Sequence, residues 1–473
     1  MKDKNSQNER VTRGIQILTG DPKKAIVKLS IPMMLAMFVQ TLYNLVDGIW
    51  VAGLGPEALA AIGLFFPVFM IVIALSAGLG VGVSSAISRR IGAKDKNGAN
   101  IAAEHGILLA LVSGVVIAVL GLVVIDEVLG MIGATGESLE LSIVYARILL
   151  LGSILLTFNN VANGILRGEG DTKRAMYAMT IGSVINMILD PVFIYTMKLG
   201  VAGAAYATVI SMAITSSLLL YWLFAKKDTY VSINLKKFKF NLDMTKDILR
   251  VGLPSSLAQI SMSVAIFVLN SFAVKEGGDF GVAVFTSAWR VINFGTVPLI
   301  GMATAVTAVT GAAFGAKDGE KLETAHLYAV KLGLILGFSV MAIILIFAPF
   351  IAKIFTYSEG GASIYNDLVI ALRILSVFLP GVPLGMLTSS MFQGIGQGEK
   401  SLVVTILRTV IMQLIFAWFF TRIIDLGLAG VWWGIVVGNA TAANITFQWG
   451  RHTVKKIKCE FSKALSSSQE VTC

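Results

Sequence analysis

The sequence is poor in cysteine and in charge. It has 2 cysteines in 473 residues, Cys459 and Cys473, both in the polar C-terminal stretch. Neither a disulfide framework nor a cysteine-based metal site follows from such a pair. Only 14% of the residues are charged, against about 25% in a typical soluble domain. Together with a hydrophobic share of 56%, this composition excludes an ordinary soluble protein.

What the sequence has instead is a series of long apolar runs. A helix of about 20 apolar residues crosses roughly 30 Å of hydrocarbon, and the runs have this length. The sequence therefore predicts an all-α membrane protein with about twelve transmembrane helices. The expected spans are about 28–54, 58–88, 101–125, 138–166, 174–197, 203–225, 248–275, 281–313, 324–350, 368–392, 401–423 and 429–450.

The formal net charge is +10, and its distribution follows the spans. With both termini inside, about 27 basic residues fall on the inner side and about four on the outer side, as the positive-inside rule requires. The excess charge therefore orients the chain in a lipid bilayer and is no nucleic-acid footprint. We expect a multi-pass protein of the cell membrane with both termini cytoplasmic. The first 24 residues are polar, and no cleaved signal peptide is expected.

The two halves of the chain resemble each other. Ile31-Pro32 is echoed by Leu253-Pro254, GAKD at 92–95 recurs at 315–318, GEG at 168–170 is echoed at 394–396, and LGVAG at 199–203 recurs as LGLAG at 426–430. The offsets are 222, 223, 226 and 227. Because six helices per half is an even number, we expect two six-helix lobes related by a pseudo-two-fold axis along the membrane normal.

The repeat predicts five segments along the chain. They are an N-terminal cytoplasmic segment (1–24), an N-lobe with helices 1–6 (25–225), a cytoplasmic linker (226–247), a C-lobe with helices 7–12 (248–450) and a cytoplasmic tail (451–473). Transporters built this way carry substrate between the lobes.

Two glycine-rich motifs do not support an enzyme. GLGVG at 78–82 lies within an apolar span, where small residues serve helix packing. GIGQGEKS at 394–401 departs from the P-loop because Glu399 stands where lysine must follow the glycine. No nucleophile set or histidine metal spacing is present either, so we expect no enzyme and no cofactor. Transport would then be driven by an ion gradient or a separate partner.

Two acids lie inside apolar spans of the first half. Gln40, Tyr43 and Asp47 share one helix face at i, i+3 and i+7, and Ser183, Asn186 and Asp190 repeat that spacing. Both acids lie about 15 residues beyond the inner end, or ~22–25 Å up. The structural alternative is that Asp47-Gly48 and Asp190-Pro191 merely break or bend their helices. Acids within a bilayer are usually functional, and the matched pair favours function.

The chemistry of this pair leaves the coupling ion open. Thr208 lies at a similar height and can join the two acids and Asn186. Two adjacent carboxylates can hold a proton, whereas the four oxygen-bearing side chains together would also suit a small cation such as Na⁺. We therefore predict an ion-coupling site at Asp47, Asp190, Asn186 and Thr208, for H⁺, Na⁺ or both.

Other polar residues in the spans carry weaker signals. Asn163 lies nearer the inner side than the acids and suits interhelical hydrogen bonding as well as ligand contact. Met179 belongs to a set of methionines that suit either packing or an adaptable apolar surface. Arg373 and Arg408 are expected to snorkel or to pair near helix ends, whereas Arg290 lies deeper and has no evident partner.

The ordered motifs resemble the multidrug and toxic compound extrusion (MATE) family. They are IPMMLAMFVQTLYNLVDGIWVAGLG, the small-residue second helix, SRRIGAKD, RGEGDTK, LDPVFIY and LGVAGAAYAT. The likeness covers nearly all of residues 21–450 and looks closest to the DinF-like branch. It implies an antiporter that exports cationic or amphipathic compounds against inward H⁺ or Na⁺ flow, expected here as a monomer.

The resemblance also implies roles for individual residues. Asp47 and Asp190 match the paired first-lobe carboxylates, with Asn186 and Thr208 as their polar partners. The positions associated with the first-lobe cavity, and hence with substrate, match Gln40, Tyr43, Tyr145, Asn163 and Met179. Another branch binds sodium at second-lobe acids, but none is embedded there in this chain. Two alternatives stay open: a flippase for lipid-linked oligosaccharides of the same superfamily and, with little support, a membrane-embedded enzyme or receptor.

Overall fold

The computed structural model describes residues 12–133, 135–226, 228–234, 236, 238–357 and 362–465. Within these ranges all regular secondary structure is helical. The ends of the predicted terminal segments, 1–11 and 466–473, lie outside the described residues.

The first lobe contains seven α-helices and is preceded by a short helix. Its elements are α1 (Arg13–Thr19), α2 (Pro22–Ala52), α3 (Pro56–Gly92), α4 (Lys96–Met131), α5 (Gly136–Leu151), α6 (Ser153–Gly168), α7 (Thr172–Pro191), η1 (Val192–Thr196), α8 (Gly200–Leu220) and η2 (Tyr221–Ala225). The π-helical turn η1 follows directly after Pro191, which has no N–H group to continue the α-helical ladder.

The second lobe begins with a single 74-residue helix, α9 (Leu242–Gly315). Gly278 interrupts it with φ 56° and ψ −149°, a conformation open to glycine, so α9 holds two consecutive spans. The remaining elements are α10 (Gly319–Phe355), η4 (Ala362–Ile364), α11 (Tyr365–Ser376), η5 (Leu379–Gly381), α12 (Val382–Gly394), α13 (Gly398–Ile406), η6 (Leu407–Ile411), α14 (Met412–Arg422) and α15 (Gly427–Leu465).

The number of spans agrees with the sequence. Ten helical segments of the described chain are long and apolar enough to cross a membrane, and α5 with α6, bent by 44°, make an eleventh. Because α9 contains two spans, the total is twelve.

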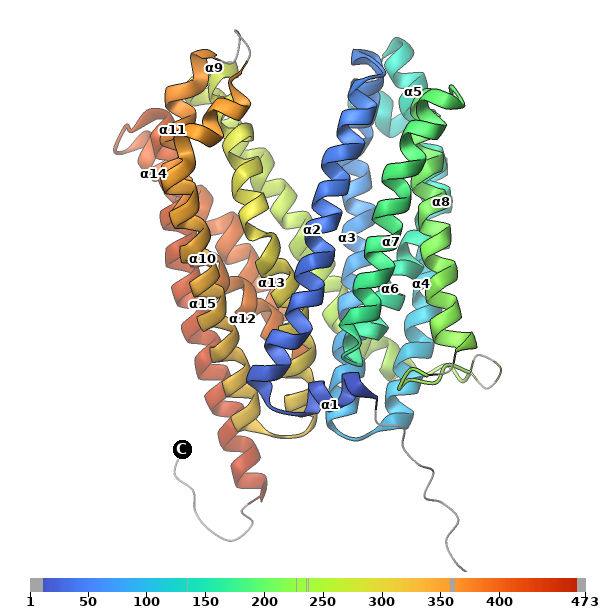
Figure 1. The fold of residues 1–473 in the computed structure, drawn as a ribbon. Helices are drawn as coiled ribbons and strands as arrows, with labels where there is room; N and C mark the ends of the chain where they lie inside the picture. The colour runs from blue at the N-terminus through green and yellow to red at the C-terminus, as the bar shows by residue number, and fades with distance from the viewer. Residues whose placement is uncertain are drawn as a thin grey trace, which may run out of the picture.

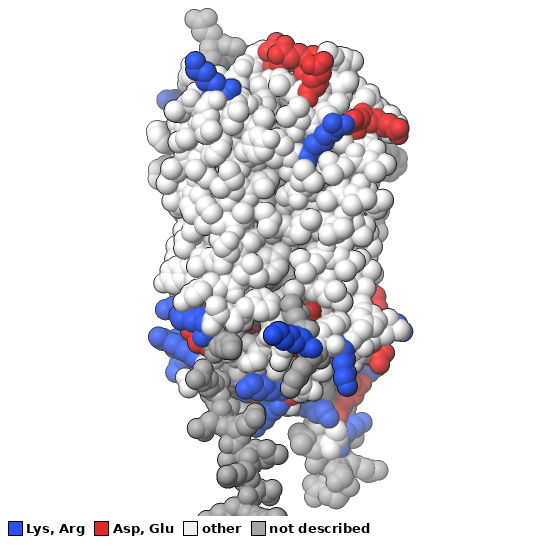
Figure 2. Space-filling view, turned by 90° about the vertical axis from the view of Figure 1, so that its right-hand side faces the viewer, with Lys and Arg blue, Asp and Glu red and all other residues white. Residues whose placement is uncertain are grey.

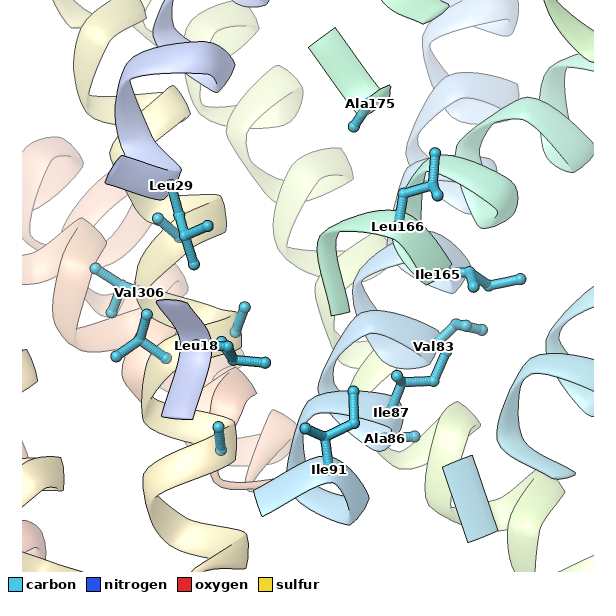
Figure 3. Close-up of a cluster of buried hydrophobic side chains, with 14 of the residues drawn as sticks. Leu18, Leu29, Val83, Ala86, Ile87, Ile91, Ile165, Leu166, Ala175 and Val306 are labelled. Atoms are coloured by element: carbon cyan, nitrogen blue, oxygen red, sulfur yellow. The ribbon is translucent and has the colours of Figure 1, made fainter. Parts of the chain in front are cut away.

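The two lobes lie side by side and come together at one end only (Figure 1). Figure 2 shows an uncharged band between the two ends, with lysine and arginine gathered at the end where the lobes converge. We call this the basic end; it carries α1 and both GAKD turns. A shared apolar core joins the lobes there, including Leu29, Val83, Ile87 and Val306 (Figure 3). Toward the opposite end each lobe has a separate core.

Two glycines allow the lobes to touch at the basic end. Gly92 of α3 packs against the backbone of Ala312 in α9, and Gly315 of α9 packs against the backbone of Arg89 in α3. A Cβ atom on either glycine would overlap a carbonyl oxygen of the other helix. Beside this crossing, Arg89 and Arg90 both pair with Asp247, at 2.9 and 2.8 Å. The crossing therefore closes the basic end by backbone contact and ion pairs.

The segment between the lobes is attached to the first lobe by side chains that accept its backbone N–H groups. Glu169 Oε2 accepts from Tyr230 and Val231, at 3.0 and 3.1 Å. His105 Nε2 accepts from the N–H of Asn241 at 2.8 Å. The linker is thus a bound part of the fold.

Glu169 predicts a pH dependence of stability. Burial raises the pKa of its carboxyl from 4.5 to about 8, against the opposing effect of the two N–H groups and of Arg174. Because the pKa of Glu169 is higher in the folded than in the unfolded state, the protonated carboxyl group stabilises the fold. This contribution is full below pH 4.5 and is lost as the pH rises through 8. We expect the melting temperature in detergent to fall between pH 6 and pH 9, and Glu169→Gln to remove much of that fall. Glu169→Ala should lower the melting temperature at both pH 6 and pH 9, because it also removes the acceptor of the two linker N–H groups. A fall of equal size in Glu169→Gln would assign the pH dependence to other groups.

Candidate functional site

The two acids predicted to act together lie together. Asp47 is half-buried in the last two turns of α2, and Asp190 is fully buried one residue before the end of α7. Their carboxyl groups lie close enough to interact directly with each other. Since an ionised carboxylate only accepts, a hydrogen bond between two such groups would need a proton on one of them. Among the described residues, no amide, hydroxyl or cationic donor reaches Asp190 Oδ1.

Asn186 and Thr208 complete the surroundings of Asp190. With the Asn186 carboxamide oriented to satisfy both of its polar atoms, Nδ2 donates to Asp190 Oδ2 at 2.9 Å and the oxygen accepts from the Thr208 N–H at 3.2 Å. The Thr208 hydroxyl donates to Ala204 O at 3.0 Å. Asn186 is one helical turn before Asp190 in α7, and Thr208 projects from α8, so two helices position the carboxyl.

Two tyrosines predicted as substrate contacts lie beside the acids. Tyr43 of α2 lies beside the Thr208 side chain of α8. Tyr145 of α5 is buried, lies within electrostatic range of Asp47, Asp190 and Tyr43, and packs edge-on against Phe65. The structure therefore brings together six side chains from α2, α5, α7 and α8. Spacing along one helix could not have revealed the Tyr43–Thr208 contact, since it joins two helices.

The other predicted substrate residues lie apart from this cluster. Gln40 is exposed on α2, one turn before Tyr43. Met179 is half-buried on α7 and packs against the shared core at the basic end. Asn163 donates to Asn159 O at 2.8 Å within α6, while Asn159 donates to Met212 O of α8 at 3.0 Å. Asn159 therefore serves a contact between helices, whereas Asn163 bonds within α6 and its buried Oδ1 has no hydrogen-bond partner among the described residues.

The second lobe has two notable arginines. Arg290 lies four residues before Phe294 and eleven before Gly301, hence on the same face of α9. Phe294 contacts Phe38 edge-on and Gly301 packs against Met34, so this face points to the first lobe. Arg290 is exposed there, one turn before Phe294, and has no carboxylate partner in the described part of the chain.

Arg408 has a partner, as one of the two expectations has it, but it pairs inside the lobe and not near a helix end. Its side chain is 5% exposed, within the π-helical turn η6, and donates to Asn439 Oδ1 at 3.2 Å. A π-helical turn and a partner on α15 hold it inside the lobe. Glu276 at the far end pairs with Arg422 at 3.0 Å.

The described residues contain no group of three or more His, Cys, Asp or Glu side chains that could hold a metal ion. Twelve spans in two lobes, joined at one end and with buried acids in one lobe, define a membrane transporter of the two-lobe kind.

Comparison with known proteins identifies the family. The MatE family model matches residues 32–192 and 254–419, one segment in each lobe. The multidrug export protein MepA of Staphylococcus aureus (strain MRSA252) is 27% identical over 421 residues, covering 89% of this chain and 91% of its own. A MATE crystal structure in complex with MaL6 is 60% identical, with a TM-score of 0.93, covering 94% of this chain and 99% of that one.

A second solved structure bears on function. It is a MOP superfamily transporter from Pyrococcus furiosus Vc1, 60% identical, with a TM-score of 0.92 over 94% of this chain and 99% of that one. Its description states that reverse polarity of the binding pocket suggests a different function.

The chain belongs to the MatE family. It is a MATE transporter and not an enzyme; its placement in the DinF-like branch stays a prediction.

Proposed function

We propose that the protein is a multidrug efflux antiporter that exchanges cationic or amphipathic compounds for an inward-moving ion. The observation that carries this proposal is the neighbouring pair of half-buried Asp47 and buried Asp190 within one lobe, neither of which has a basic ion-pair partner among the described residues. Binding or release of a proton or cation changes the charge of such a pair. Because an unpaired carboxylate inside a membrane protein costs free energy, this change alters which packing of the helices is the more stable. The pair thereby links ion binding to movement of α2 and α7.

We propose the proton as the coupling ion. Asn186 presents its N–H group to Asp190, and a donor at this position suits a carboxyl pair sharing a proton better than a bound cation. Sodium remains the alternative, because rotating the Asn186 amide would assemble an oxygen-only set with Asp47, Asp190 and Thr208.

Orientation follows from the charge distribution. We propose that the protein lies in the plasma membrane and that its basic end faces the cytoplasm, as the positive-inside rule requires. The lobes then close toward the cytoplasm and part toward the outside, which is an outward-open state (Figure 1). We propose that the chain acts as a monomer within the bilayer, with no cofactor beyond the coupling ion. The predicted segments 1–24, 25–225, 226–247, 248–450 and 451–473 fit this assignment, with the linker and both termini cytoplasmic.

Reconstitution tests the proposal directly. Purified protein in liposomes should move a fluorescent cationic dye against an imposed pH gradient, with sodium absent from both sides. A sodium gradient at constant pH should drive less dye if the proton is the coupling ion. Dye movement that is indifferent to both gradients would rule out antiport by this protein.

One observation favours a second function. The exposed Arg290 on the face of α9 toward the first lobe would suit an anionic head group, as a flippase for pyrophosphate-linked oligosaccharide lipid requires. The description of the Pyrococcus furiosus relative gives this alternative added weight. A flippase predicts that Arg290→Ala loses scrambling of a fluorescent pyrophosphate lipid and that Arg290→Lys retains part of it. Dye antiport with no lipid movement in the native protein would exclude the flippase.

A further inference from the structure

A cavity of about 350 Å³ lies at the basic end, on one side of the crossing between α3 and α9. Its walls come from α1, α3 and α9 and are mostly apolar. They include Ile15, Leu18, Ile91, Val309, Ala312 and Ala313. Figure 3 shows Leu18 of α1 and Ile91 of α3 in this part of the molecule. The cavity is distant from the carboxyl pair. Both acids lie near the C-terminal ends of their helices, α2 and α7, which are the ends farther from the basic end.

The internal repeat explains why the cavity on this side of the crossing has apolar walls. The offset of 223 that relates Gly92 to Gly315 also relates Arg89 to Ala312 and Arg90 to Ala313. On the far side of the crossing the two arginines pair with Asp247. On the cavity side the matching positions are alanines, so this cavity has apolar walls, whereas the hollow on the far side is lined by Arg89, Arg90 and Asp247.

The edge of the cavity is cationic. Lys94 and Lys321 line it, and no carboxylate of the described residues pairs with Lys94. Lys321 donates to Thr19 O at 3.2 Å and lies 3.7 Å from Asp318 Oδ2. The neighbouring acids Asp21 and Asp95 instead accept backbone N–H groups at the starts of their helices.

We infer that this cavity is a binding site for a single-chain amphipathic anion, an alkyl chain ending in a carboxylate. The apolar walls suit the chain, and Lys94 and Lys321 at the edge suit the anionic group. About 350 Å³ is near the lower end for small-molecule sites, which fits one short chain rather than a two-chain lipid.

Occupancy would have a direct effect on the closure of the basic end. The helix α3 belongs to the first lobe, which α1 precedes, and α9 belongs to the second lobe. The cavity is therefore complete only while the two lobes are in contact. A ligand that needs all three helices stabilises the closed basic end by its differential affinity for that state. A bound ligand should therefore slow transport in any cycle that must open the basic end. Only this expected slowing rests on the proposed antiport function; the binding site itself does not.

The test is binding of radiolabelled decanoate to the full chain in phosphatidylcholine nanodiscs, with empty nanodiscs subtracted. Native protein should bind saturably, and decanol and inorganic phosphate should compete poorly, because each lacks one half of the recognition. Lys94→Asn should weaken binding about fivefold, the effect of losing one exposed charge contact. Asparagine is chosen because Lys94 has φ 58°, a conformation that asparagine tolerates.

A matched control exists in the other GAKD turn. Lys317 has φ 54° and lines the opposite side of the crossing, so Lys317→Asn should leave decanoate affinity unchanged. Ala316→Leu, which fills the cavity edge, should abolish binding while dye transport persists. Equal loss in Lys94→Asn and Lys317→Asn, equal competition by decanol, or no saturable binding above empty nanodiscs would overturn the proposal. Loss of dye antiport with decanoate binding intact would count against the proposed function alone.

Discussion

Asp47→Asn is expected to abolish dye movement driven by an ion gradient while leaving the protein folded and able to bind dye. Asparagine is nearly isosteric with aspartate, can donate to Asp190 and cannot titrate, so it imitates one protonation state permanently. Coupling between two sites is typically about 5–150-fold in affinity, and loss of the titrating member removes it. Gradient-driven uptake into liposomes should fall at least about tenfold relative to native protein.

Two companions sharpen this prediction. Asp190→Asn should have the same effect, because the proton is shared by the pair and either acid is needed to release it. Glu57→Gln is the matched control: Glu57 is an exposed carboxylate of the first lobe at the start of α3, and its loss should leave transport unchanged. Native coupling in Asp47→Asn would remove Asp47 from the mechanism. Equal loss in Glu57→Gln would indicate a general effect of charge.

The carboxyl pair was predictable because its signal is repeated. Asp47 and Asp190 each close a polar stripe at the same spacing and the same depth, and charge is rare enough in these spans to make both conspicuous. The structure adds what one helix cannot encode. Tyr43 reaches Thr208 of α8, and the direction of the Asn186 amide depends on Asp190 and the Thr208 backbone together.

Arg408 shows where sequence reasoning failed. Counting along the span places it near a helix end, but the π-helical turn at Leu407–Ile411 and the carboxamide of Asn439, 31 residues later, hold it inside the lobe. By contrast, twelve spans and two lobes followed from run length and repeats, and the paired glycines Gly277 and Gly278 mark the break in α9. Local pattern therefore predicts the elements, while contacts between distant segments decide buried polar chemistry.

The second large effect is expected at the glycine crossing of the basic end. In Gly92→Ala the new methyl group would overlap the carbonyl oxygen of Ala312, and in Gly315→Ala it would overlap that of Arg89. Both obstacles are backbone, so α3 and α9 must separate. Because a penalty of only 1.4 kcal/mol lowers a population about tenfold, closure of this end should become rare. We expect dye transport to fall about tenfold or more in either variant.

The reason for the loss can be distinguished from misfolding. Asp47 and Asp190 are remote from the crossing, so dye binding by the purified variants should persist, and distances between spin labels across the basic end should increase. Gly48→Ala and Gly63→Ala are suitable controls, since a Cβ atom at either position meets nothing within 4 Å. If Gly315→Ala transports like Gly48→Ala, close approach of α3 and α9 is not needed for the cycle. If distances increase while transport stays normal, closure at this end does not limit turnover.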